Sequence, residues 1–289
     1  MFIVTDVVEW QWLHRSVLVA SGAPAGAVAP STASTEVVVT IRPGDAQQAA
    51  AEQGAQHDVL VAIGGDGTLN EVINGLEADR PVALCPVGTG NVLAKELRLP
   101  RRPEAFCKMV GVGREQMLDL ASAGGRRFVS MAGVGFDAEV AAEIAARRRG
   151  AIHLLSYVAP IVRCFVRYGF PRLEVSVDGG APVEAVGFLG ISNVRAYGGP
   201  FLITPDASPS DGFLDVCALR RGSLLSRFRA LFAFLVRLPR ALSGAQYLRG
   251  RSIRVTADEP VRYQVDGDPA GFLPATFEIL ERKLRMIVP

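Results

Sequence analysis

An apolar segment at 58–63 runs into Gly64-Gly65-Asp66-Gly67 and then into a helical pattern at 68–76. A strand that passes through a glycine turn into a helix is half of a strand–helix–strand unit, which restricts the chain to few folds. In such sheets ligands bind at the carboxyl ends of the strands. Thr68 is positioned to cap the helix, and Glu71 completes a capping box. Free N–H groups at the helix start would then face an anion such as phosphate.

A second strand repeats this arrangement. The segment 81–87 is followed by Gly88, Thr89 and Gly90 and by a helical pattern at 91–97. Glycines let the backbone approach a ligand closely, so two such turns on consecutive strands can enclose one nucleotide. Neither turn matches G-x-x-x-x-G-K-[ST] or G-x-G-x-x-G, so the common nucleotide fingerprints do not apply.

Asp66 raises a question about the first turn. A carboxylate beside phosphate groups is repelled unless a cation intervenes or the carboxylate accepts a hydrogen bond. We therefore expect Asp66 to work through Mg²⁺ or through a hydroxyl of the ligand. The alternative is that Gly-Asp-Gly is simply a favourable turn. The second glycine turn on the adjacent strand weighs against that alternative.

The order of the expected elements indicates an α/β fold in the first part of the chain. Strands are expected at 15–21, 36–40, 58–63 and 81–87, and helices at 42–56, 68–76 and 91–97. Strands that alternate with helices need crossover connections and form a parallel sheet. The sequence therefore predicts a Rossmann-like α/β nucleotide-binding domain over residues 1–120.

The pattern changes after about Asp119. Apolar segments with alternation, such as "RLEVSVDG", "AVGFLGISN" and "VRYQVDG", follow one another. Helical stretches interrupt them near 137–167 and 223–242. This pattern predicts a mainly antiparallel β domain over residues 121–289.

The composition argues against several classes of protein. A net charge of +2 over 289 residues predicts neither a nucleic-acid binder nor an acidic tail. The four cysteines show no metal-ligand spacing, so we expect reduced thiols in a cytoplasm. The N-terminal stretch "MFIVTDVVEW" lacks the features of a signal peptide. No stretch reaches the roughly 18 uninterrupted apolar residues of a spanning helix.

Several motifs resemble the diacylglycerol kinase catalytic-domain family of lipid kinases, which includes bacterial diacylglycerol kinases and sphingosine kinases. They are "VVVTIRPGDA", "GGDGTLNEVINGL", "PVGTGNVLAKELRLP", "MAGVGFDAEV", "NVRAYGGPFLITPDASPSDGFLDV" and "VDGDP". NAD kinases share Gly-Gly-Asp-Gly-Thr, but the Asn-Glu-x-x-Asn-Gly continuation and the Gly-Thr-Gly-Asn turn favour a lipid kinase. The resemblance implies an α/β nucleotide domain and a β-sandwich domain with the active cleft between them. The last strand can return to the first domain.

The resemblance also implies roles for individual residues. ATP would be held by Thr40, Gly64, Gly65, Asp66, Gly67, Thr68, Leu69, Asn70 and Thr89. Asp211 would hold a structural Mg²⁺ together with the carbonyl groups of Ser208 and Phe213. Asp268 would accept the proton of the lipid hydroxyl, a position where many relatives carry Glu. Taken without the resemblance, Asp211 and Asp268 also suit plain turns.

The N-terminal region departs from the family pattern. Relatives carry an Asn-Pro-x-Ser-Gly phosphate loop after the first strand, and then a helix. Here the strand expected at 15–21 runs into "ASGAPAGAVAPSTAS", where only Ser21-Gly22 is similar to that loop. Three explanations stay open: another glycine loop does the work, the start is truncated or misassigned, or ATP binding is weakened.

A lipid kinase must meet its substrate at a bilayer, and the segment 223–238 has the features of a basic amphipathic helix. One helical face of this segment carries apolar side chains, and its arginines suit an anionic surface. The apolar residues on that face are Leu224, Leu225, Phe228, Leu231, Phe232 and Leu235. The alternative is a helix packed on the core with a solvated arginine face. We therefore expect ATP and a membrane lipid as partners, no nucleic acid, and a cytoplasmic location that allows peripheral contact with the inner face of the membrane. A homodimer is left open.

These observations predict an ATP- and Mg²⁺-dependent lipid kinase that acts on the hydroxyl of diacylglycerol or a related lipid such as a sphingoid base. One rival is an NAD kinase-like enzyme, which would phosphorylate NAD and ignore lipid. The other is a regulator that binds nucleotide or lipid without turnover, as the altered N-terminal loop suggests. No residue in the sequence indicates which lipid is used.

Overall fold

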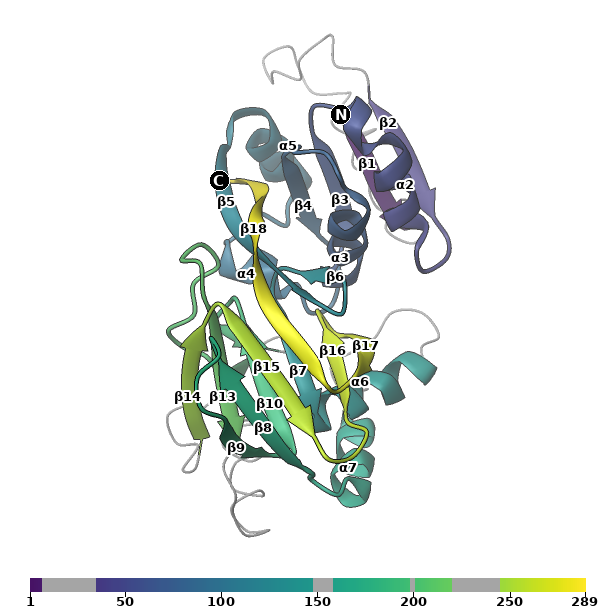
Figure 1. Cartoon of the computed structure of the whole chain (residues 1–289). Coiled ribbons are helices and arrows are strands. Elements are labelled where there is room, and N and C mark those ends of the chain that lie inside the picture. Colours follow the sequence, from purple (N-terminus) through teal and green to yellow (C-terminus); the bar gives the residue numbers. More distant parts are fainter. Residues whose placement is uncertain (7–34, 148–157, 198–200, 220–244) are drawn as a thin grey trace. The chain divides into compact units, whose positions relative to one another are not determined.

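The computed structural model describes residues 1–6, 35–147, 158–197, 201–219 and 245–289 (Figure 1). The strand expected at 15–21 and the helix expected at 223–238 lie outside these residues. The chain forms two compact units. The first comprises Met1–Leu118 and Lys283–Pro289, and the second comprises Asp119–Arg282.

The first unit is built on parallel strands. These are β1 (Phe2–Asp6), β2 (Glu36–Thr40), β3 (Leu60–Gly64) and β4 (Val82–Pro86), in the order β2-β1-β3-β4. The end of β18 (Ala275–Val288) pairs in parallel with β4 through Met286 and Val82. Every residue of β3 and β4 is buried, as expected for parallel strands that are covered on both faces.

Helices connect these strands, as the sequence pattern predicted. They are α2 (Asp45–Gln53) with the 3-10 turn η1 (Gly54–Gln56), α3 (Asp66–Gly75), α4 (Val92–Glu96) and α5 (Pro103–Val112). After α5 the chain enters β5 (Arg114–Ala123), which leads into the second unit. The parallel sheet and its crossover helices confirm the α/β class.

The strand at the very start of the chain was not foreseen. β1 lies between β2 and β3, and Val4 is fully buried. The first strand of this sheet is therefore 2–6, and the departure from the family pattern has to be sought after Asp6 rather than after residue 21. A run of only a few apolar residues at a chain terminus, without a turn before it, is too short to be recognised as a central strand.

The second unit contains an antiparallel six-stranded sheet in the order β14-β13-β10-β7-β16-β17. Its strands are β7 (Met131–Gly135), β10 (Phe188–Ser192), β13 (Leu214–Leu219), β14 (Ala245–Gly250), β16 (Arg262–Val265) and β17 (Asp268–Phe272). A second antiparallel arrangement joins the first part of β18 to β15 (Ser252–Ala257), β8 (Arg172–Val177) and β9 (Val183–Val186).

Shorter elements complete the second unit. These are the strands β6 (Arg126–Phe128), β11 (Ala196–Tyr197) and β12 (Phe201–Leu202), and the helices α6 (Phe136–Arg147) and α7 (Val158–Arg167). The helix expected over 137–167 is thus described as two helices.

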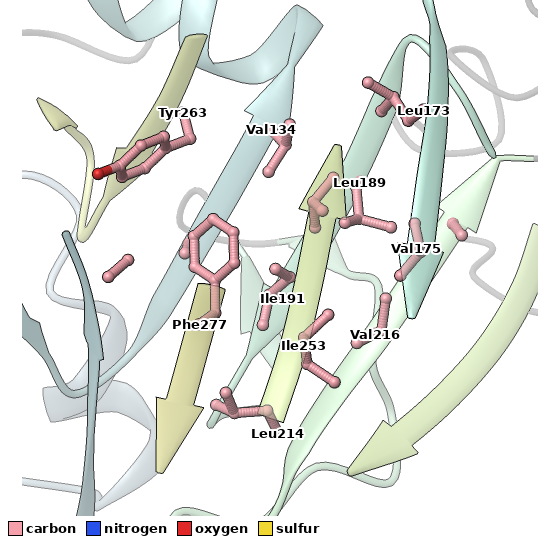
Figure 2. Packing of buried hydrophobic residues seen from close by; sticks show 14 of the residues in the cluster. Val134, Leu173, Val175, Leu189, Ile191, Leu214, Val216, Ile253, Tyr263 and Phe277 are labelled. Carbon is pink, nitrogen blue, oxygen red and sulfur yellow. The ribbon is translucent and has the colours of Figure 1, made fainter. Parts of the chain in front are cut away.

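The core of the second unit lies between its two sets of strands. Figure 2 shows Val134, Leu189 and Ile191 from the six-stranded sheet close to Leu173, Val175 and Ile253 from the other strands. Alternate residues of β8 and β15 are completely buried, which is the period-2 pattern that the sequence showed. Two antiparallel layers around one apolar core make a β-sandwich, so the predicted fold class of this part is confirmed.

Candidate functional site

The first glycine turn joins β3 to α3 differently from the sequence prediction. The helix begins at Asp66, two residues earlier than expected, with Gly65 as its N-cap and no side-chain cap. Thr68 lies inside the first turn of α3 and leans over Gly64, where any Cβ would clash with the threonine side chain. Glu71 accepts a hydrogen bond from the backbone N–H of Ala46 at 3.2 Å. The predicted capping box is therefore wrong, because Asp66 and Gly67 themselves adopt helical geometry.

The two glycine turns touch through their backbones. A Cβ at Gly88 would lie 2.5 Å from Gly65 Cα and 3.0 Å from Gly65 N. The N–H groups of Val87 and Gly88 both donate to the carbonyl of Gly64, at 3.1 and 3.4 Å. Only residues without a side chain allow this approach. The strand order β3-β4 thus brings together the two turns that the sequence placed 24 positions apart, from Gly64 to Gly88.

The carboxylate of Asp66 has an intramolecular partner. Its Oδ1 accepts hydrogen bonds from the N–H groups of Val92 at 2.8 Å and Leu93 at 3.3 Å, at the first positions of α4. Burial raises the pKa of Asp66, while these hydrogen bonds and the charge of Lys95 oppose that rise. Asp66 therefore caps the helix that follows the second turn and ties the two turns together. The Asp66 carboxylate can lie within the first glycine turn because N–H groups at the start of α4 donate hydrogen bonds to it.

The other residues expected to contact a nucleotide fall into two groups. Leu69 and Asn70 are each 1% exposed, so their side chains lie inside the protein. They can serve a ligand only through their backbone groups or by stabilising α3. Thr40, at the end of β2, is buried, and its hydroxyl donates to the carbonyl of Thr5 at 3.2 Å. Thr89, by contrast, is exposed.

Gly67 has a distinct environment. A Cβ built on it would meet no atom within 4 Å, although Gly67 is the second residue of a ten-residue helix. Protein packing therefore does not require a glycine there. Open space beside the N–H groups at a helix start is where an anion can approach the backbone.

The loop that leads to β13 carries the predicted metal-binding residues. Asp211 Oδ1 accepts a hydrogen bond from the N–H of Phe213 at 3.1 Å, and Asp211 Oδ2 pairs with the guanidinium of Arg249. That guanidinium also lies 4.7 Å from the centre of the Phe213 ring and 3.8 Å from Asp215. Ser208 is partly buried in the same loop. A cation of the protein itself therefore neutralises Asp211.

This arrangement does not fit Mg²⁺ held by Asp211, Ser208 and Phe213 as it stands. A divalent ion at the Asp211 carboxylate would lie beside the positive charge of Arg249, which would have to move away first. Within the described ranges no group of three or more His, Cys, Asp or Glu side chains is placed to hold a metal ion. A second carboxylate beside Arg249, that of Asp215, has a buried Oδ2 without a hydrogen-bond partner. Burial, and more weakly the charges of Asp211 and Asp206, raise the pKa of Asp215, whereas Arg249 opposes that rise.

Sequence reasoning missed Asp119 in this region. Asp119 is completely buried and accepts a hydrogen bond from the N–H of Gly212 at 2.6 Å, next to Asp211. Asp119 therefore holds the loop in place. An acid within the otherwise apolar run "MLDLA" was the signal that could have revealed it.

The predicted proton acceptor, Asp268, opens β17 directly after a two-residue hairpin turn. The turn residues Asp266 and Gly267 have φ of 47° and 93°, and Val265 pairs with Asp268 across the hairpin. Two positive φ values are the mark of a type I′ turn, for which Asp-Gly is a preferred sequence. The turn is therefore made by the two preceding residues, and the Asp268 side chain is not needed to form it.

Asp268 is partly exposed and forms an ion pair with Arg126 at 3.0 Å. Asp266 is buried, and its carboxylate accepts hydrogen bonds from the N–H groups of Val129, Ser130 and Met131 at 3.0–3.1 Å. The sequence did not single out Asp266 or Arg126. Two neighbouring carboxylates thus differ in role, since one anchors the turn inside the protein and the other is presented outside it.

Comparisons with known proteins match both units. Residues 25–123 match the family model of the diacylglycerol kinase catalytic domain. Residues 130–288 match that of the YegS C-terminal NAD kinase beta sandwich-like domain. The diacylglycerol kinase of Bacillus subtilis is 28% identical over 88% of this chain and 86% of its own length. The diacylglycerol kinase of Staphylococcus aureus strain JH9 is 27% identical over 88% of this chain and 82% of its own.

Solved structures share the fold. A diacylglycerol kinase from Bacillus anthracis superimposes with a TM-score of 0.71 at 18% identity, covering 100% of this chain and 96% of that one. An NAD kinase from Archaeoglobus fulgidus, solved with ATP, gives a TM-score of 0.53 at 13% identity, covering 99% of this chain and 93% of that one. Structures with sequence identity this low show a shared fold and carry no conclusion about function. In the part of the chain that the structure describes, no helix has the length and apolarity needed to span a bilayer.

Proposed function

Because the chain belongs to the diacylglycerol kinase catalytic-domain family of lipid kinases, we propose that it transfers the γ-phosphoryl group of ATP to the hydroxyl of a lipid. The lipid is diacylglycerol or a related molecule such as a sphingoid base. The observation that carries the proposal is that one chain joins this catalytic-domain match to the matching β-sandwich domain, with relatives named diacylglycerol kinase along most of its length.

The glycine turns of the first unit are the proposed ATP site. The phosphates approach Gly67, where the chain leaves open space, and accept hydrogen bonds from N–H groups at the start of α3. The run Gly64–Asn70, Thr89 and Thr40 make up this site. Asp66 contributes by holding the two turns together, since its carboxylate caps α4. ATP enters as its Mg²⁺ complex, as phosphoryl donors usually do.

The second unit supplies the proposed proton acceptor. The oxygen of the lipid hydroxyl attacks the γ-phosphorus, the bond from that phosphorus to the β–γ bridging oxygen breaks, and ADP leaves. The hydroxyl proton passes to the carboxylate of Asp268. The ion pair with Arg126 holds this carboxylate at the start of β17. A partly exposed carboxylate at the start of a strand can be approached by a substrate.

A structural Mg²⁺ at Asp211 would have to compete with Arg249 for the carboxylate. We place the protein at the inner face of the membrane, reached through the basic segment 223–238. Replacing Arg227, Arg229 and Arg237 with Gln should lower binding to anionic vesicles at low salt and leave activity on a short-chain soluble lipid unchanged. Unaltered vesicle co-sedimentation would contradict this placement.

One assay tests the proposed function. Labelled ATP is incubated with the purified protein and with micelles of diacylglycerol, of a sphingoid base, or of neither, and separately with NAD. We expect label in a lipid and none in NAD, and we expect Asp268→Asn to abolish most of it. Label in NAD alone would establish the rival activity, which the shared fold of the NAD kinase makes worth measuring. ATP binding without any product would indicate a regulator.

A further inference from the structure

We propose that Gln264 is a positioning residue for Asp268. Its side-chain amide holds the turn that presents Asp268, and it is itself held by Asp137 and Tyr197. The inference rests on the proposed function in one respect, which is that Asp268 is the proton acceptor. These four residues come from three separate parts of the second unit.

The nitrogen and the oxygen of the Gln264 side-chain amide both form hydrogen bonds. The residue is 1% exposed. Its Nε2 donates to Asp137 Oδ2 at 2.8 Å and to Tyr197 Oη at 3.2 Å, while its Oε1 accepts from the N–H of Gly267 at 2.7 Å. Turning the amide over would set its NH₂ group against the Gly267 N–H and its oxygen against the Asp137 carboxylate. Only one orientation of the amide is therefore compatible with its neighbours.

Asp137 and Tyr197, which accept hydrogen bonds from this amide, are themselves held in place. Tyr197 is 1% exposed, and its hydroxyl donates to Asp137 Oδ2 at 2.7 Å. A Cβ on Gly133 of β7 would clash with the Asp137 carboxylate and the Tyr197 hydroxyl, and would lie 2.8 Å from Gln264 Nε2. Gly133 sits inside a strand, where glycine weakens the structure unless something approaches closely. The space above this glycine is filled by the three polar groups of the network.

The hairpin turn is held at both of its residues. The amide of Gln264 holds Gly267, and backbone groups of the segment 129–131 hold Asp266. Asp266 is held by three N–H groups of the segment 129–131, and its own N–H donates to the carbonyl of Met131 at 2.8 Å. Gly267 is the next residue, and the hydrogen bond to Gln264 holds its N–H. The register of β16 and β17 shifts between Tyr263 and Gln264, where β17 carries one additional residue, Ala270. Gln264 and Asp268 therefore both lie in the short segment between the hairpin turn and this irregularity, and the amide of Gln264 holds the turn end of that segment.

Gln264→Met tests the proposal, because it keeps the length of the side chain and removes all three of its hydrogen bonds. We expect kcat to fall by about 10- to 100-fold, since a displacement of the order of 1 Å has that effect on a reacting group. The KM for ATP should be unchanged, and amide hydrogen exchange at Gly267 should be faster. Gln56→Met is the matched control, because Gln56 is exposed and donates a single hydrogen bond to the Glu52 carbonyl. It should behave like the wild type.

Gln264→Glu separates positioning from loss of folding. At low pH the introduced carboxyl group is protonated, so it can donate to Asp137 and still accept from Gly267, as the amide does. As the pH rises, two carboxylates face each other and repel, so kcat relative to the wild type should decline with pH. Tyr197, which bonds to Asp137, and Cys217, which packs against Tyr197, stay neutral, because burial raises the pKa of Tyr197 and raises that of Cys217 to about 12. Glu139, also on α6, is paired with Arg262 at 3.3 Å.

The outcomes are distinct. A folded Gln264→Met protein with the kcat of the wild type overturns the proposal. So does a kcat that falls only in proportion to the folded fraction, with exchange at Gly267 unchanged. If the wild type phosphorylates no lipid, the proposed function fails, and exchange at Gly267 in Gln264→Met still decides whether the amide holds the turn.

Discussion

Replacing Gly67 with alanine should strengthen the fold and weaken ATP binding at the same time. The added methyl group would meet no protein atom within 4 Å, so the substitution introduces no clash. It also replaces a glycine near the start of α3 with the best helix-forming residue. If ATP phosphates approach this backbone, the same methyl group occupies their space.

The two effects can be estimated separately. Glycine within a helix costs roughly 0.5–1 kcal/mol relative to alanine, and the lower value suits a first-turn position. For a chain of this size, that gain corresponds to a rise in Tm of about 1–2 °C. For the ligand, a phosphate displaced by a methyl group should lose at least one good hydrogen bond, or about 1.4 kcal/mol, which is roughly a tenfold increase in the Kd for ATP.

Thermal unfolding and ATP titration by calorimetry measure the two effects on the same preparation. Gly88→Ala provides the contrast, because its Cβ would lie 2.5 Å from Gly65 Cα, about 1 Å too close for two carbons. Such overpacking costs about 1–3 kcal/mol, so both stability and ATP affinity should fall. If Gly67→Ala raises the Tm and leaves the Kd for ATP unchanged, ATP does not bind against this helix start, and the proposed phosphate site is wrong.

Three further changes test other parts of the site. Asp268→Asn should lower kcat by about 10²-fold or more with little change in ATP affinity, while Asp268→Glu keeps activity; an Asn variant as fast as the wild type would place the base elsewhere. Asp66→Ala leaves two N–H groups at the start of α4 without their acceptor, so it should lower the free energy of unfolding by about 1–3 kcal/mol and weaken ATP binding. An unchanged midpoint in chemical denaturation would contradict the capping role. Arg249→Gln removes the positive charge from Asp211, so added Mg²⁺ should raise the Tm of this variant more than that of the wild type; equal shifts would show that Arg249 does not compete with the metal.

The sequence alone determined the class of both units and the approximate position of many of their strands and helices, but not that of β1. Strands β3 and β4 are continuous apolar runs, and β8 and β15 alternate, so local periodicity reported how these segments are buried. The two glycine turns were also readable, because a closely approached backbone restricts the residue type. These features depend on neighbours in the chain, which the sequence presents directly.

The tertiary structure decided which partners the polar residues find. Asp66 caps a helix that begins 26 positions later, Asp211 meets Arg249 across 38 positions, and Gln264 reaches Asp137 across 127. No local pattern encodes these pairs, because each depends on which strands become neighbours in the sheet. The capping box failed for the same reason: Glu71 was three residues from Thr68, but the fold offered it the N–H of a different helix. Hydrogen bonds form with whichever donor the packed backbone brings within about 3 Å, and that is settled only when the strand order is complete.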